Sequence, residues 1–147
     1  MTEAVTFPSD GLQLSGAVHL PEGLRPGERR PAIIMMHGFG ANKNGGPEWV
    51  CRQFAAWGYV ALRFDYRGCG ESEGERGRII PSEEIADALN AVSYMAARPE
   101  VDPDNRVDGQ VDSFAGFGNS GREIKNHLGR AIAQLVVAQS FSVARCR

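Results

Sequence analysis

Hydrophobic and polar residues alternate along the first twenty positions of the chain. Val5 and Phe7 lead into the segment 8–11, which holds Pro, Ser, Asp and Gly, and Leu12 and Leu14 continue the alternation beyond it. A period of two that is interrupted by such turn residues predicts an antiparallel hairpin with one buried and one solvent-exposed face.

Two later segments, 32–36 and 59–64, are hydrophobic runs without such alternation. Runs of this kind predict parallel strands that are covered on both faces. Between them, Val50, Phe54 and Trp57 recur at helical spacing and predict a helix with one apolar face.

Glycine and proline mark the ends of the expected helices. We expect Gly46 to cap the first helix and Gly58 to stop it, whereas Ser82 would cap a second helix that ends at Pro99. Strands that alternate with helices after a hairpin predict an α/β sheet, and the catalytic groups of such sheets gather at the carboxyl ends of the strands.

The composition narrows the class of protein. The chain has 147 residues, 42% hydrophobic and 23% charged, with a net charge of -2, which fits one soluble globular domain. It has no apolar run long enough to span a membrane and no secretory pattern, and its three Cys fit a reducing compartment, so we expect a cytoplasmic protein. Residues 122–147 are basic, but their charges are dispersed around one aromatic residue, so no nucleic-acid partner is expected.

Three motifs follow one another along this pattern. His-Gly-Phe-Gly occupies 37–40, Asp-Tyr-Arg-Gly-Cys-Gly-Glu-Ser occupies 65–72, and a helix end leads into Pro-Asp-Asn-Arg-Val within 97–107. In this order and spacing they resemble the α/β-hydrolase family over residues 3–107, in the branch with feruloyl esterases, dienelactone hydrolases and X-prolyl peptidases. The resemblance implies a serine hydrolase that cleaves small-molecule esters or amides, with no cofactor and no metal.

The resemblance assigns the His-Gly-Phe segment to an oxyanion hole. The Phe39 N–H would stabilise the negative oxygen of a tetrahedral intermediate, which is worth several kcal/mol. His37 is interpreted as a residue that braces the loop rather than as a catalytic base. Asp65 and Arg67 are likewise expected to organise loops.

The spacing of the family places the nucleophile at Ser113 and the second oxyanion N–H at Phe114. The local sequence departs from the family there, because Val111 and Ala115 stand where glycines are expected. The segment that leads in, 107–110, is also too polar for a central strand.

A second serine fits a pattern without fitting its context. Ser72 lies within Gly70-Glu71-Ser72-Glu73-Gly74, which matches G-x-S-x-G. A nucleophile elbow requires a strand directly before the serine and a helix directly after it. We therefore expect Ser72 to be a solvated loop residue.

The remaining members of a triad are not apparent. After Asp112 the acidic and imidazole candidates are Glu123 and His127, which lie four residues apart on one predicted helix. We therefore expect residues 1–107 to form the N-terminal half of a hydrolase domain and 108–147 a divergent tail with a degraded nucleophile region. Truncation or a shifted reading frame near residue 107 would explain the divergent tail. Such a half domain is not expected to be an efficient enzyme, and its unpaired sheet edge would make it prone to self-association. The alternative is a non-catalytic remnant or interaction module.

A rival pattern lies in the tail. Residues 116–121 match G-x-G-x-x-G, resembling NAD-dependent 2-hydroxyacid dehydrogenases, and a helix and a short strand at 135–138 would follow. The acid expected about 20 residues later falls near Gln139 or Ser140, which are not acidic. Dinucleotide binding is the less favoured interpretation.

Overall fold

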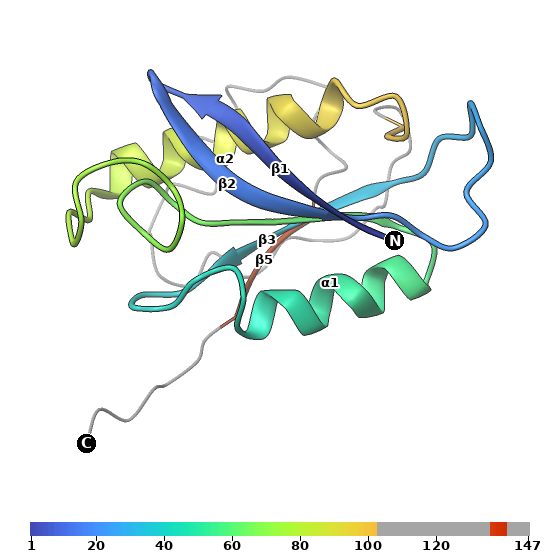
Figure 1. Cartoon of the computed structure of the whole chain (residues 1–147), viewed down its shortest axis with the longest axis horizontal. Coiled ribbons are helices and arrows are strands. Elements are labelled where there is room, and N and C mark those ends of the chain that lie inside the picture. The colour runs from blue at the N-terminus through green and yellow to red at the C-terminus, as the bar shows by residue number, and fades with distance from the viewer. Residues whose placement is uncertain (103–135, 141–147) are drawn as a thin grey trace.

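The computed structural model describes residues 1–102 and 136–140, which form a mixed sheet in the strand order β1-β2-β4-β3-β5 with a helix on each face (Figure 1). This arrangement confirms the predicted α/β class, with a hairpin followed by parallel strands. The elements are β1 (Thr2–Ser9), β2 (Leu12–His19), β3 (Ala32–His37), α1 (Gly46–Ala56), β4 (Val60–Phe64), α2 (Pro81–Ala96) and β5 (Val136–Ser140).

The N-terminal hairpin closes through a two-residue turn. Ser9 pairs with Leu12, and the intervening Asp10 and Gly11 have φ angles of 47° and 84°. Positive φ at both central residues gives a turn whose twist matches that of the strands, which is why Asp-Gly is favoured there. The hairpin joins the rest of the sheet through β2, which pairs antiparallel with β4.

Strands β3 and β4 run parallel and are buried on both faces. Ala32 pairs with Val60 and Met36 with Phe64. Alternate residues of β3 enter two different cores: Ile33 and Met35 pack with Cys51 of α1, and a second set packs in the core that includes α2. Burial on both faces explains the unbroken hydrophobic run of β3 and the largely hydrophobic run of β4, in which Arg63 is the charged residue.

The helix ends differ in part from the prediction. Gly45, not Gly46, is the N-cap of α1, and Ile80, not Ser82, is the N-cap of α2. Both helices have proline in the first turn, where its fixed φ and missing N–H favour a helix start without a side-chain cap. Gly58, at a φ of 92°, follows the end of α1 as expected.

The expected apolar face of α1 is narrower than its spacing suggested. Trp57 is 67% exposed, although its ring still meets that of Phe54 edge to face at 5.3 Å. Within the described residues, no helix is long and apolar enough to cross a membrane.

Strand β5 pairs with β3 in parallel. Ile33 is in register with Val136 and His37 with Ser140. A short strand at 135–138 was expected from the sequence, but not its position beside β3. The predicted helix in the tail lies outside the described residues, and the boundary at residue 107 stays a prediction.

Candidate active site

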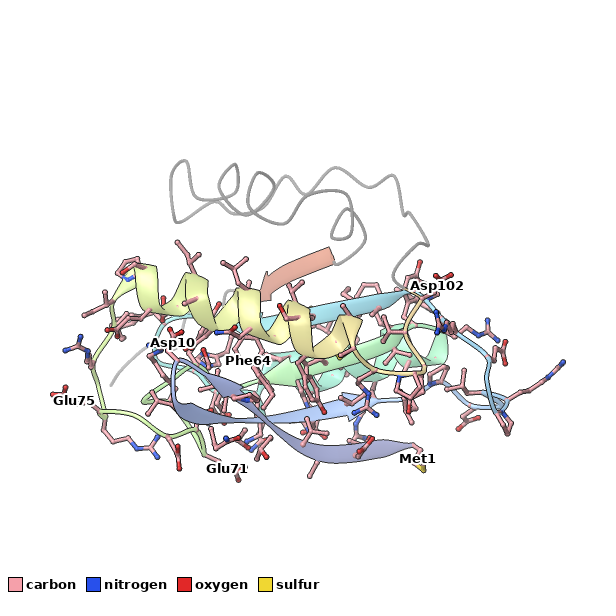
Figure 2. All side chains as sticks on the ribbon, turned by 90° about the horizontal axis from the view of Figure 1, so that it is seen from above. Met1, Asp10, Phe64, Glu71, Glu75 and Asp102 are labelled. Carbon is pink, nitrogen blue, oxygen red and sulfur yellow. The ribbon has the colours of Figure 1, made fainter. Side chains whose placement is uncertain are left out.

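The carboxyl ends of three parallel strands meet at one edge of the sheet. Met36 is in register with Phe64, and the next residue of β3, His37, is in register with Ser140 at the end of β5. The loops that follow β3 and β4 therefore start side by side. Figure 2 shows Glu71 and Glu75, both on the loop after β4, on the other side of the molecule from Met1 and Asp102.

His37 joins these two loops. Its Nδ1 lies 3.0 Å from the Gly38 carbonyl oxygen, and its Nε2 lies 3.3 Å from the Tyr66 amide nitrogen. A carbonyl only accepts and an amide only donates, so Nδ1 carries the proton and Nε2 is the acceptor. His37 is buried, with both ring nitrogens used, and has the bracing role that we expected.

The Gly38–Phe39 peptide is oriented by its own carbonyl. The Gly38 oxygen accepts hydrogen bonds from His37 and from the Ala41 amide at 3.1 Å. In a planar trans peptide the N–H points away from the C=O, so these bonds also direct the Phe39 N–H. Among the described residues that N–H has no acceptor, and the Phe39 side chain is 88% exposed. An amide held in this way is suited to bind a negative oxygen.

A buried ion pair holds the far end of the same loop. The Asp65 carboxylate accepts from the Lys43 amide at 2.6 Å, from the Lys43 Nζ at 2.9 Å and from the Glu71 amide at 3.0 Å. Burial raises the pKa of Asp65, but these hydrogen bonds outweigh it, so the net pKa is lowered. Asp65 is thus a charged hub between the loops after β3 and β4.

Arg63 extends this network through the sheet. Its Nη1 donates to the Lys43 carbonyl at 2.9 Å and to the Asn44 Oδ1 at 2.6 Å, and its Nε donates to the His19 Nε2 at 3.0 Å. Burial and the charge of Arg63 lower the pKa of His19 to about 4. His19 is therefore a neutral acceptor near pH 7.

Ser72 is not the solvated residue that the sequence suggested. It is fully buried; its Oγ donates to the Asp65 carbonyl at 2.6 Å and accepts from the Ser15 amide at 2.8 Å. The acidic and glycine neighbours of Ser72 are typical of an exposed loop. Its hydrogen-bond partners, Ser15 and Asp65, are not adjacent in the sequence, so its burial could not be predicted. The hydroxyl is used structurally, which agrees with the rejection of Ser72 as a nucleophile.

Of the predicted site residues, the structure describes Phe39. The candidate nucleophile Ser113 and the Phe114 amide lie outside the described residues, as do Glu123 and His127. The glycine pattern expected to bind a dinucleotide lies outside them as well.

Ser140, which ends β5 in register with His37, was not among the nucleophiles expected from the sequence. A signal was present in the sequence. Ser140 follows the apolar run 135–138 and has small residues, Ala138 and Ser142, two positions before and after it. These are the positions that glycine occupies in a nucleophile elbow.

A hairpin followed by parallel strands, with an oriented amide at their carboxyl edge, is the arrangement expected of an α/β hydrolase. The sequence model of the family described as serine aminopeptidase, S33, matches residues 27–105, which is more than half of the chain. The chain therefore belongs to this family of α/β hydrolases.

Comparison with individual proteins gives the same result. Thiohydrolase aneE of Aspergillus aculeatus is 38% identical over 96 residues, covering 65% of this chain and 29% of its own. The hypothetical protein PA2218 of Pseudomonas aeruginosa has a TM-score of 0.67 at 33% identity, covering 71% of this chain and 33% of its own. The α/β hydrolase GrgF of a Penicillium species has a TM-score of 0.65 at 29% identity, covering 71% of this chain and 35% of GrgF. The chain spans about a third of the length of these relatives.

Proposed function

We propose that this protein is a serine hydrolase that cleaves carboxylic ester, thioester or amide bonds in small molecules. The observation that carries the proposal is the Gly38–Phe39 peptide, whose carbonyl is held by two donors while its N–H stays without an acceptor among the described residues. Membership of the hydrolase family supports it. The thioester is included because one relative is named a thiohydrolase.

In the proposed reaction a serine hydroxyl attacks the substrate carbonyl. The carbonyl oxygen becomes negatively charged, and the Phe39 N–H stabilises it together with the amide that follows the nucleophile. The leaving alcohol, thiol or amine takes the proton that the serine gave up, and water then releases the acyl group. His19 and His37 do not serve as the base, because each uses its Nε2 in a structural hydrogen bond.

Two serines are candidates for the nucleophile. Ser113, with the Phe114 amide as the second oxyanion donor, remains the candidate from family spacing. The strand order favours Ser140, because β5 lies directly beside β3 and ends at the edge that carries Phe39. In this alternative the Phe141 amide would be the second donor.

A fluorophosphonate probe tests both the activity and the assignment. The nucleophilic oxygen bonds to phosphorus and fluoride leaves, so an active serine gains a mass that tandem mass spectrometry locates. We expect stoichiometric labelling of the 147-residue chain that is lost in Ser140→Ala and kept in Ser113→Ala. The control is Ser93→Ala, because the Ser93 hydroxyl on α2 is exposed and, among the described residues, bonds only to the Leu89 carbonyl of its own helix.

Each other outcome has a defined meaning. Labelling that is lost in Ser113→Ala and kept in Ser140→Ala would restore the assignment from family spacing. No labelling of the wild-type chain, with the fold intact, would overturn the hydrolase proposal and favour a non-catalytic interaction module.

A further inference from the structure

We propose that the buried Lys43–Asp65 ion pair is a positioning device for the Phe39 amide, so that Lys43 acts on catalysis through the loop 38–45 without touching substrate. The inference rests on the proposed function. It adds a residue that neither the family spacing nor the sequence motifs pointed to.

The loop 38–45 has one buried residue, and it is Lys43. The other residues of this loop are exposed or half-buried, and Phe39 and Gly40 are both exposed. Apolar packing therefore does little to hold the loop. Lysine is rarely buried unless it is paired, and here its side chain is only 5% exposed. Its burial draws the end of the loop into the protein.

The two ends of the loop are held by different strands. At the start, His37 at the end of β3 holds the Gly38 carbonyl. The second anchor is Lys43, four residues after Phe39. Asp65, which follows β4, binds the amide and the ammonium of Lys43, and Arg63 of β4 binds its carbonyl. Because Phe39 lies between two anchors, its amide cannot turn without breaking one of them.

The contacts of Asp65 are too specific for a purely stabilising ion pair. A buried ion pair is weak support for stability, because an apolar pair of similar volume often does as well. An apolar pair, however, has no acceptor for the Lys43 amide or for the Glu71 amide. The Lys43 Nζ also bonds to the Glu71 Oε2 at 2.6 Å, so one ammonium joins two carboxylates on the loop after β4.

The test replaces the pair by a neutral one. Lys43→Met with Asp65→Asn leaves no unpaired buried charge, which is the main hazard of a single substitution. Because a displacement of about 1 Å can cost 10²-fold in rate, we expect the maximal rate of fluorophosphonate labelling to fall by roughly 10- to 100-fold. The probe concentration at half-maximal rate should change by less than about threefold, because the loss lies in the transition state.

A milder variant protects the test against misfolding. Glu71→Gln removes the outer carboxylate, whose side chain is 70% exposed, and keeps Asp65. It should lower the labelling rate in the same sense but less. The matched control is Arg78→Gln on the same loop, which breaks the surface pair with Glu83 of α2 at 2.7 Å and should leave the labelling rate unchanged.

Hydrogen exchange gives a readout that does not depend on activity. Amides of peptides covering 38–45 should exchange faster in the double variant and in Glu71→Gln, but not in Arg78→Gln. An unchanged labelling rate in a folded double variant, or an equal loss in Arg78→Gln, would overturn the inference. If the wild type is not labelled at all, the proposed function fails, and unchanged exchange in the double variant would separately show that the pair does not order the loop.

Discussion

Two buried carboxylates, Asp65 and Asp87, each form an ion pair with a basic side chain, but they hold different parts of the molecule together. Both residues are fully buried, and each makes an ion pair, Asp65 with Lys43 at 2.9 Å and Asp87 with Arg67 at 2.7 Å. The difference lies in what each pair connects.

Asp87 connects elements that already pack together. From α2 it accepts from the Arg67 amide and guanidinium and from the Ser9 hydroxyl, and Asn90 donates to that same hydroxyl. It thereby fastens the end of β1 and the loop after β4 to α2. Asp65 instead fastens one loop to another at the edge that carries the Phe39 amide. The Asp87–Arg67 ion pair thus stabilises the scaffold, whereas the Asp65–Lys43 ion pair holds the loops of the proposed site.

The largest expected effect on stability comes from Asp87→Ala. It leaves Arg67 and Ser9 without their buried acceptor, and breaking a buried pair in this way costs about 3–5 kcal/mol. We expect this loss in urea unfolding, while protein that remains folded is labelled by fluorophosphonate at the wild-type rate. Asp10→Asn removes the exposed partner of Arg67 and should cost less than about 1 kcal/mol. A slow labelling rate in folded Asp87→Ala would erase the distinction between the two carboxylates.

The next effect is on rate rather than stability. Phe39→Pro removes the free N–H from the loop that Asp65 holds, and loss of one oxyanion donor costs about 10²–10³ in rate, or roughly 2.7–4 kcal/mol. Phe39→Ala keeps the N–H and loses only an exposed ring, so hydrolysis of an activated ester should stay near the wild-type rate. Equal losses in the two variants would mean that the side chain, not the amide, matters.

The third prediction concerns pH, because the Asp65 network reaches a histidine through Arg63. The folded pKa of His19 is about 4, lowered from 6.5, so the unfolded chain binds the extra proton between these values. Stability from this group is complete above pH 6.5 and falls as the pH drops toward 4, by up to about 3 kcal/mol. Urea unfolding at several pH values should show this loss in the wild type and a shallower slope in His19→Gln. Parallel curves would contradict it.

The smallest effect separates two glycines. Gly70 and Gly77 both have positive φ, 47° and 77°, so alanine costs roughly 1–2 kcal/mol at either position. A Cβ on Gly70 would meet the Asp65 carboxylate, whereas none of the surroundings of Gly77 lies within 4 Å. Gly70→Ala should therefore cost about 1–3 kcal/mol more in urea unfolding, and it alone should slow labelling. Equal costs would mean that Asp65 moves away freely.

Local patterns were sufficient for most of the elements. The hairpin follows from alternation around Asp10 and Gly11, and the two parallel strands from hydrophobic runs, because the period of a strand is written in adjacent residues. Helix starts were less accurate. Pro47 and Pro81 allow each helix to begin without a side-chain cap, so Ser82 is not used as the N-cap. The exact first residue of a helix depends on the conformation of the chain that precedes it.

Contiguous residues encode the class of sheet, the motifs that mark the family and the segment after β3 that we propose as an oxyanion site. The tertiary structure alone decided that Ser72 is buried against Ser15, that Lys43 reaches Asp65 and that β5 lies beside β3. These contacts join residues far apart along the chain. The hydrophobic pattern of neighbouring residues does not predict such long-range contacts, because they form only when the strands come together in one sheet.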